Sequence, residues 1–520
     1  MEVYGGAPAM GIGDVANMIS VAAPGAEDTK LSVTLPKVEG YTVEYRGTDL
    51  EQIVDAELNI NRPLIDKEVK LAFKVTEDAT GKYVLTEVPV TVPGRQQANT
   101  GNAAPVILPE LSEWAGGSGV FDITGQTSVY YTDASLANVV ERFAADLSEV
   151  LGFEISAVQG EGDGIVFTTS TDPAVVALGE EGYTLSVTGS RVTVTAPTSD
   201  DWDATTGANW GAQTLLQAAE QGDGSLPQGE ARDYPLYKVR GIILDVGRKT
   251  FTMDWLNQLV RQMAYYQADD LNIHLNDNYI PIEQYVADGI DPADLEKGRT
   301  RASAWESDIT EGDTFTFGDV KHTARTDLTS TDLFYTKAEF REFIDSFAEF
   351  GVNISPEIDT PAHSLALSQG PFPDLSYGVM RHRNRDHLDI INQYDQVVDM
   401  VKTIWDEYTV GDDAAFSGAR YINIGADEFN VSGTGDHDTG NALTTGEAYR
   451  RFVNDLSNYM LDEGYTPRVW GSLSNYSGDN SIIEHPELAQ VLLWNSGYAH
   501  MDEMYDMGYQ LIFCDDGQYY

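Results

Sequence analysis

The chain has 520 residues, of which 42% are hydrophobic and 22% are charged. This composition excludes a disordered chain. Asp and Glu number 83 against 32 Lys and Arg, and the net charge of −51 disfavours a nucleic-acid partner. Cys514 is the single cysteine, so no internal disulfide and no multi-cysteine metal site is expected. No apolar run approaches the roughly 18 residues that span a bilayer.

The N-terminal part of the chain has the pattern of short strands. Residues 1–27 remain unassigned, and they lack the basic start and apolar centre of a signal peptide. Residues 28–94 alternate apolar and polar positions between Gly, Pro and Asp, as in "YTVEYRG" and "VKLAFKVTE". This pattern predicts an all-β sandwich of immunoglobulin-like type. The polar residues 95–104 then predict a linker.

Residues 105–232 mix the two kinds of periodicity. Strand patterns such as "YTLSVTGSRVTVTAP" alternate with helical ones such as "SLANVVERFAADLSEVLG" and "WGAQTLLQAAEQ". A compact α+β domain is therefore predicted. It contains no catalytic cluster, so we expect it to support the C-terminal part of the chain.

From residue 236 to 520, buried strands are followed repeatedly by amphipathic helices. Seven strands are expected at "KVRGIILDVG", "ADDLNIHLN", "GVNISPEI", "RYINIGAD", "TPRVWGS", "AQVLLWN" and "YQLIFCDD". Repeated βα units predict an α/β fold, a (β/α)₈ TIM barrel. Because the chain ends in the loop after the seventh strand, we expect the C-terminal part of the barrel to be missing.

Polar and aromatic residues follow the predicted strands, where a barrel builds its active site. Taken alone, each would more often be a helix cap, an ion-pair partner or a packing residue. Together, carboxylates beside planar aromatic rings are what glycoside hydrolysis requires. The residues are Asp245, Arg248, His274, Asp277, Glu357, Asp359, His363, Asp427, Glu428, Trp470 and Trp494.

Six short segments that contain or adjoin these residues resemble a known family. In order and spacing, "YKVRGIILDVGRK", "NIHLND", "PEIDTPAHS", "NIGADEF" and "RVWG" followed by "VLLWN" are similar to the strand-end motifs of glycoside hydrolase family 20. That family contains β-N-acetylhexosaminidases and lacto-N-biosidases. The resemblance covers residues 236–520, and the preceding α+β segment is similar to the domain that usually precedes such a barrel. Asn423 departs from the pattern, since many members have His there.

The resemblance implies a role for each matching residue. Glu428 matches the general acid/base, Asp427 the residue that orients the 2-acetamido group, and Arg248 the arginine that grips sugar hydroxyls. Asp277, His363 and Asp359 match residues that lie behind the acid and tune it. Walls of the sugar pocket are implied for Trp470 and Trp494, and an acetamide contact for Tyr519 or Tyr520. No metal and no cofactor is implied.

The adjacent carboxylates suggest how such a site would work. Two close carboxylates do not both ionise readily, so one is expected to have a raised pKa and serve as the acid, and we assign this to Glu428. In the family the nucleophile is the acetamide oxygen of the substrate. The expected partner is thus a glycan with a terminal β-linked N-acetylhexosamine, cleaved outside the cell or at its surface by a protein whose signal peptide has been removed.

Three alternatives stay open at the level of sequence. A lacto-N-biosidase would release a disaccharide, and "HLNDN", "EIDTPAHSLA" and "NIGADEF" lean toward that branch of the family. A metal-dependent hydrolase would use the ligands His274, Asp277, Glu357, Asp359 and His363. A glycan-binding or adhesive protein would carry a degenerate site.

Overall fold

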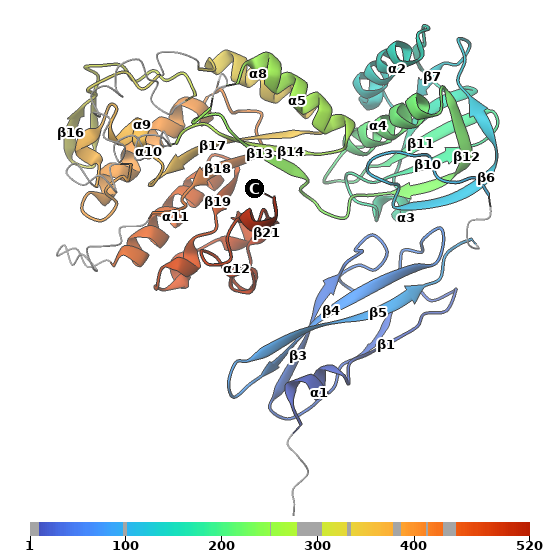
Figure 1. The fold of residues 1–520 in the computed structure, drawn as a ribbon, viewed down its shortest axis with the longest axis horizontal. Coiled ribbons are helices and arrows are strands. Elements are labelled where there is room, and N and C mark those ends of the chain that lie inside the picture. Colours follow the sequence, from blue (N-terminus) through green and yellow to red (C-terminus); the bar gives the residue numbers. More distant parts are fainter. Residues whose placement is uncertain are drawn as a thin grey trace, which may run out of the picture. The chain divides into compact units, whose positions relative to one another are not determined.

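The chain forms two compact units in a computed structural model (Figure 1). One unit contains residues 1–238 with 265–267, and the other contains residues 239–264 with 268–520. The structure describes residues 10–96, 101–249, 251–277, 304–329, 334–377, 386–411, 414–429 and 444–519.

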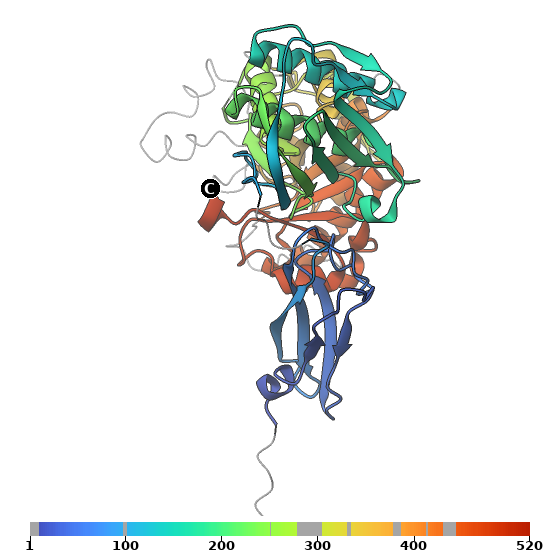
Figure 2. The same cartoon turned by 90° about the vertical axis from the view of Figure 1, so that its right-hand side faces the viewer.

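The first unit begins with a small β-rich part. Its main sheet is antiparallel, in the order β3-β4-β5, and β1 pairs separately with β2. Figure 2 shows this part of the chain in blue. Along β4 every second residue is fully buried, from Val69 to Val75. Val15 and Ile19 belong to the same core, which therefore includes residues before position 28. The elements are α1 (Ile12–Ala16), β1 (Ser20–Ala22), β2 (Ser32–Thr34), β3 (Tyr41–Thr48), β4 (Lys67–Glu77) and β5 (Tyr83–Val92). Immunoglobulin-like topology stays a prediction.

The rest of the first unit is an α+β domain. Its sheet has the order β6-β12-β10-β11-β9-β7-β8, and the helices α2 (Ala137–Leu151) and α4 (Thr205–Gln221) contact each other and the sheet. Trp210 on α4 is 1% exposed, so this helix is central to the core. The strands are β6 (Glu113–Asp122), β7 (Val129–Tyr131), β8 (Ala157–Gln159), β9 (Gly164–Ser170), β10 (Tyr183–Val187), β11 (Arg191–Pro197) and β12 (Ser225–Asp233).

The second unit contains the parallel sheet. In its described residues seven strands pair in chain order and all in parallel. They are β13 (Gly241–Asp245), β14 (Asp270–His274), β17 (Asn353–Thr360), β18 (Tyr421–Gly425), β19 (Thr466–Trp470), β20 (Gln490–Leu493) and β21 (Gln510–Phe513). The seven predicted strands are thus confirmed, as a curved, barrel-like sheet in which the described residues pair β13 and β21 with one neighbour each.

Helices connect these strands, as the periodicity predicts. They include α5 (Met253–Tyr265), α8 (Lys337–Ala348), α10 (Tyr394–Thr409), α11 (Thr445–Asp462) and α12 (Met501–Met507), and a hairpin of β15 (Thr314–Phe317) and β16 (Val320–Thr323) is inserted before α8. α8 begins with a capping box in which the Thr336 hydroxyl accepts from the Glu339 N–H. Its apolar face, which includes Phe340, Phe343 and Phe347, is buried.

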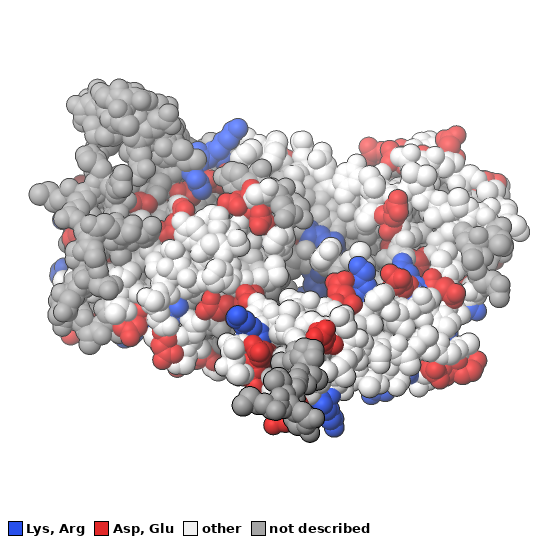
Figure 3. Space-filling model, turned by 60° about the horizontal axis from the view of Figure 1, so that its bottom comes forward, with Lys and Arg blue, Asp and Glu red and all other residues white. Residues whose placement is uncertain are grey.

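Acidic side chains lie on the described surface of the protein. On the face drawn in Figure 3, acidic side chains are scattered among uncharged ones. In the described part of the chain, every helix is too short or too polar to cross a lipid bilayer.

Candidate active site

The inner strands of the parallel sheet carry polar residues at every second position. β14 reads Asp-Leu-Asn-Ile-His and all five residues are buried. Side chains alternate between the two faces of a strand, so Asp270, Asn272 and His274 share one face while Leu271 and Ile273 occupy the other. The sheet therefore has one polar face and one apolar face, and the polar face needs internal partners because it is buried.

The lowest layer of this polar face is a buried ion pair. Arg468 on β19 donates from Nη1 and Nη2 to the two carboxylate oxygens of Asp270, both at 2.7 Å. Nη1 also donates to the Ser355 hydroxyl at 2.9 Å. This bidentate geometry lies at the N-terminal ends of β14 and β17, away from the strand ends where chemistry is expected.

The middle layer is centred on Glu357, which is 0% exposed. Its Oε1 accepts from His274 Nδ1 at 2.5 Å and from Trp470 Nε1 at 2.8 Å. Its Oε2 accepts from the side-chain amides of Asn272 at 2.5 Å and Asn423 at 2.8 Å. Burial opposes ionisation of Glu357, but the charge and hydrogen bond of His274 outweigh it and lower the pKa of this carboxyl.

The upper layer joins Arg248, Asp277 and His363. Asp277 Oδ2 lies 2.5 Å from Arg248 Nη2 and 2.6 Å from His274 Nε2, and Oδ1 lies 2.9 Å from His363 Nδ1. Burial alone would raise the pKa of Asp277, but His363 and His274 hold it far below its usual range. Asp245, at the end of β13, lies 2.5 Å from Arg248 Nε and fixes the guanidinium from its other side.

Asp427 and Glu428 lie just beyond β18, and both face His363. His363 Nε2 is 3.2 Å from Glu428 Oε2 and 3.6 Å from Asp427 Oδ1. The predicted site residues Arg248, Asp277, His363, Asp427 and Glu428 are therefore brought together at the C-terminal ends of the strands.

The backbone that presents these groups is strained. Among the described residues, six that are not glycine have positive φ, and three of them are His363 (50°), Ala426 (74°) and Glu428 (45°). Such conformations cost about 1–3 kcal/mol each and cluster at functional sites. Gly425 has φ 74°, and a Cβ there would overlap Asp359 Oδ1, which accepts from the Ala426 N–H at 3.0 Å.

The electrostatics of the carboxylate pair differ from the sequence prediction. The imidazole of His363, whose Nε2 lies 3.2 Å from Oε2, lowers the pKa of Glu428, whose side chain is 43% exposed. Burial raises the pKa of Asp427, and burial together with the charge of Asp427 raises that of Asp359. The prediction that Glu428 has the raised pKa was wrong for this structure, because an imidazole lies against Glu428 and more of the burial falls on Asp427.

The protonation of His363 follows from its neighbours. Burial opposes the charged form, but Asp427 and Asp277 outweigh it and raise the pKa of His363 well above its usual value. The raised pKa favours the imidazolium form of His363, which has carboxylates beside both ring nitrogens.

Two tryptophans border this group. Trp470, the last residue of β19, is tied to Glu357. Trp494 follows β20, and its ring lies 4.6 Å from that of Tyr498 between centroids, at 36°. The Tyr498 hydroxyl donates to Glu428 Oε1 at 3.4 Å. Sequence reasoning missed Tyr498, and its only signal was an aromatic residue four positions after Trp494.

The remaining predicted tyrosines cannot be placed at the site. The backbone of Tyr519 belongs to α13 (Asp516–Tyr519), but its side chain lies outside the described residues, as does all of Tyr520. Their predicted contact with the acetamide group stays a prediction.

The histidines and carboxylates lie close enough to one another to suggest metal ligands. Three described groups place their ligand atoms within 4.8 Å of one another: Asp245, His274 and Asp277; His274, Glu357 and Asp359; Asp359, His363 and Asp427. However, both ring nitrogens of His274 and of His363 already face carboxylates. A metal ligand must be a neutral imidazole with a free lone pair, so this arrangement suits a proton network better.

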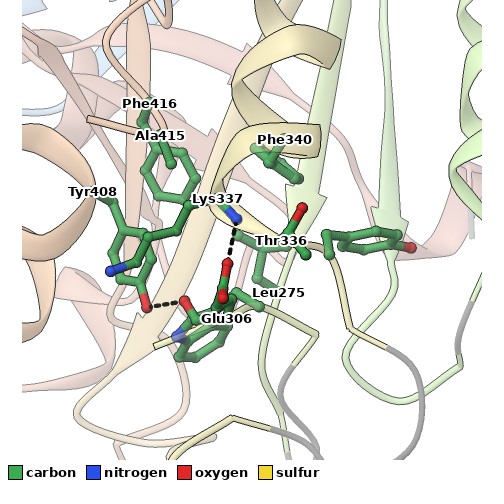
Figure 4. Close-up of a pocket in the computed structure, with 10 residues that line it drawn as sticks. Leu275, Glu306, Thr336, Lys337, Phe340, Tyr408, Ala415 and Phe416 are labelled. Atoms are coloured by element: carbon green, nitrogen blue, oxygen red, sulfur yellow. Dashed lines mark hydrogen bonds between the residues drawn. The ribbon is translucent and has the colours of Figure 1, made fainter. Parts of the chain in front are cut away.

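A separate cavity near α8 is too small for a sugar. Its volume is about 10 Å³, which corresponds to one water molecule. Figure 4 shows Glu306 beside it, whose carbonyl oxygen accepts from the Tyr408 hydroxyl at 2.8 Å and whose carboxylate accepts from the Lys337 backbone N–H at 2.9 Å. We assign it a structural role.

A barrel-like parallel sheet with carboxylates and tryptophans at its strand ends defines a glycosidase-like fold and site. Comparison with known proteins identifies the family. Residues 237–520 match the model of the glycosyl hydrolase family 20 catalytic domain, and residues 104–234 match that of domain 2 of the same family. The chain therefore belongs to glycosyl hydrolase family 20, as the strand-end motifs predicted.

Individual relatives are distant. The chain is 24% identical over 432 residues to a lacto-N-biosidase of Bifidobacterium bifidum, an alignment covering 80% of this chain and 33% of the relative. It is 25% identical to a β-N-acetylhexosaminidase of Cellulomonas fimi, covering 74% of this chain and 72% of that protein. The chain thus spans a third of the length of the first relative.

Solved structures share the fold. An exo-β-N-acetylglucosaminidase of Vibrio harveyi superposes with a TM-score of 0.56 at 17% identity, covering 85% of this chain and 66% of that one. A β-N-acetylhexosaminidase of Bacteroides fragilis gives a TM-score of 0.55 at 19% identity, covering 78% and 74%.

Proposed function

We propose that this protein is a retaining exo-β-N-acetylhexosaminidase that uses the acetamide group of its substrate as the nucleophile. The observation that carries the proposal is the convergence of Asp427 and Glu428 on the single nitrogen His363 Nε2. In the ordinary retaining scheme two carboxyl groups flank the scissile bond, one as acid and one as nucleophile. Two carboxylates directed at one nitrogen suit neighbouring tasks on the same side of the sugar.

Each residue then has a defined task. Glu428 is the more exposed carboxyl and protonates the leaving oxygen, so catalysis requires its protonated form. Asp427 stabilises the positive charge that develops on the acetamide-derived ring. Arg248, held by Asp245 and Asp277, presents its guanidinium to sugar hydroxyls. Trp470 and Trp494 stack on the terminal sugar, which suits chain ends better than an open cleft.

The released product is a single N-acetylhexosamine in the first candidate function and a disaccharide in the second. Lacto-N-biosidase action, releasing a disaccharide, is the second candidate because the alignment to the Bifidobacterium bifidum enzyme covers 80% of this chain. Product analysis on defined β-linked glycans separates the two, with Glu428→Gln as the inactive control. Release of N-acetylhexosamine supports the first candidate and release of a disaccharide the second. Rapid production of mid-sized fragments from a long polymer would contradict exo action.

Two further rivals have their own tests. If the site is a metal centre, dialysis against a chelator abolishes activity, whereas the proposed mechanism predicts unchanged turnover. If the chain is a glycan-binding or adhesive protein, it binds the sugar without hydrolysing a chromogenic N-acetylglucosaminide. Turnover that is lost in Glu428→Gln would exclude such a binding protein.

We also propose that the protein acts outside the cell or at its surface, where glycan chain ends are accessible. The acidic composition and the single cysteine are compatible with this location. Fractionation of the producing cells tests it, and recovery of the protein in the cytosolic fraction alone would contradict it.

A further inference from the structure

We propose that Glu357 is a positioning residue that holds both the indole of Trp470 and the chain of ring and carboxylate contacts behind Glu428, so that one carboxylate couples the sugar-stacking wall to the acid. The inference rests on the proposed function for the identity of the wall and the acid. Glu357 itself touches neither the substrate nor the acid.

Glu357 accepts as many hydrogen bonds as a carboxylate can. A carboxylate offers about four lone-pair positions, and all four are used here. The donors come from three strands: His274 and Asn272 on β14, Asn423 on β18 and Trp470 on β19. An apolar side chain would fill the same space without desolvating a charge, but it would leave these buried donors unpaired.

A continuous chain of contacts connects Glu357 to Glu428. From Glu357 Oε1 the contacts run through His274 Nδ1 at 2.5 Å and from His274 Nε2 to Asp277 Oδ2 at 2.6 Å. They continue from Asp277 Oδ1 to His363 Nδ1 at 2.9 Å and end between His363 Nε2 and Glu428 Oε2 at 3.2 Å. Each link fixes the orientation of the next ring or carboxylate.

The same oxygen of Glu357 also binds Trp470, the proposed wall of the sugar pocket. Glu357 Oε1 accepts from Trp470 Nε1 at 2.8 Å. The orientation of the indole is thus fixed by the atom that starts the chain to the acid. Rotation of Glu357 would displace the stacking surface and the imidazole of His274 together.

The isosteric amide distinguishes positioning from simple space filling. In Glu357→Gln one oxygen still accepts, but the NH₂ group faces two N–H donors and disrupts one side of the cluster. The matched control is Asp270→Asn, which makes the same carboxylate-to-amide change in the buried pair with Arg468, on the same face of the sheet but at the opposite strand ends.

The main readout is the ratio of kcat/KM for an activated aryl β-N-acetylglucosaminide to that for a substrate with a poor leaving group. Glu357→Gln is expected to raise this ratio by about tenfold or more, since only poor leaving groups need the acid fully, and to raise KM. Asp270→Asn is expected to lower the melting temperature and leave the ratio unchanged. Equal ratios in both variants and the wild type would overturn the proposal.

Two further variants, each of which removes only one of the two contacts of Glu357 Oε1, keep the test decisive even if Glu357→Gln does not fold. Trp470→Phe removes one donor and is expected to raise KM without changing the leaving-group ratio. His274→Gln interrupts the chain of contacts from Glu357 to Glu428 and is expected to raise the leaving-group ratio with little change in KM. A wild-type ratio in His274→Gln would overturn the coupling.

A readout independent of turnover separates this inference from the proposed function. In protein with ¹⁵N-labelled tryptophan and histidine, Glu357→Gln is expected to shift both the Trp470 indole N–H resonance and the ring nitrogens of His363. Asp270→Asn is expected to shift neither. Failure of all N-acetylglucosaminide turnover would refute the function alone, whereas an unmoved His363 signal would refute the coupling alone.

Discussion

His363 Nε2 lies 3.2 Å from Glu428 Oε2, while the other nitrogen of the same ring lies 2.9 Å from Asp277 Oδ1. The imidazolium is thus held between a carboxylate that stays ionised and the carboxylate that must carry a proton in catalysis. Its charge lowers the pKa of Glu428 and opposes the rise that burial causes in the pKa of Asp427. The protein therefore sets both carboxylates through one histidine.

Replacing His363 with Gln is expected to shift both the acid limb and the alkaline limb of the pH profile of kcat/KM to higher pH. Without the positive charge the pKa of Glu428 rises, so its protonated form persists to higher pH and the alkaline limb moves up. The pKa of Asp427 also rises, so its ionised form appears only at higher pH and the acid limb moves up. The profile in the free enzyme reports both groups, and an alkaline limb that moved down would contradict this assignment.

Replacing Glu428 with Gln is expected to reduce turnover by about 10²- to 10⁴-fold on substrates with poor leaving groups. Activated aryl glycosides should lose much less, since their leaving groups depart without a proton. Glu428 is 43% exposed, so the melting temperature should stay close to that of the wild type. Equal losses on both kinds of substrate would show that Glu428 is not the acid.

Replacing Asp427 with Asn is expected to lower kcat by about 10²- to 10³-fold, the usual range for losing one preorganised electrostatic group. Stability should behave differently. Burial raises the folded-state pKa of Asp427, so ionised Asp427 costs stability above the unfolded pKa of about 3.9. Thermal unfolding at pH 7 should therefore show an unchanged or higher melting temperature in the variant, and a large decrease would mean that the ionised carboxylate stabilises the fold.

Replacing Gly425 with Ala is expected to be harmful despite its small size. The position has φ 74°, and the added Cβ would overlap the Asp359 carboxylate that holds the Ala426 N–H. We expect a loss of about 1–3 kcal/mol in the free energy of unfolding, measured by denaturant titration, together with reduced kcat. Gly464 has φ 90°, and a Cβ added there would meet no atom within 4 Å, so Gly464→Ala controls for backbone strain alone.

Much of the site was predicted from the rule that a barrel builds its active site at the C-terminal ends of its strands. Apolar runs that give way to polar residues identified Arg248, Asp277, His363, Asp427 and Glu428, and the structure brings them together. Parallel strands are buried on both faces, so their apolar runs are long and easy to recognise. The start of the N-terminal core was less visible, because Val15 lies in a short helix and Ile19 in the connection just before β1, and neither segment has strand periodicity.

The middle layer of the site could not be predicted in the same way. Glu357 and Asn272 were visible as polar residues at alternate positions in buried strands, but their pairing depends on strand register, here Glu357 opposite both His274 and Asn423. The opposite directions in which the pKa values of Asp427 and Glu428 shift also depend on where His363 lies, which spacing along the chain does not reveal. Tyr498 reaches Glu428 from a loop, where periodicity carries no signal.

The proposed mechanism makes the acetamide of the substrate the nucleophile, and one measurement addresses this directly. Values of kcat/KM for the same chain should be determined on an aryl β-N-acetylglucosaminide and on the aryl β-glucoside with the same leaving group. The mechanism predicts that the glucoside hardly reacts, because its 2-hydroxyl cannot replace the attacking acetamide oxygen. Comparable rates on the two substrates, or a sugar trapped covalently on Asp427, would contradict it.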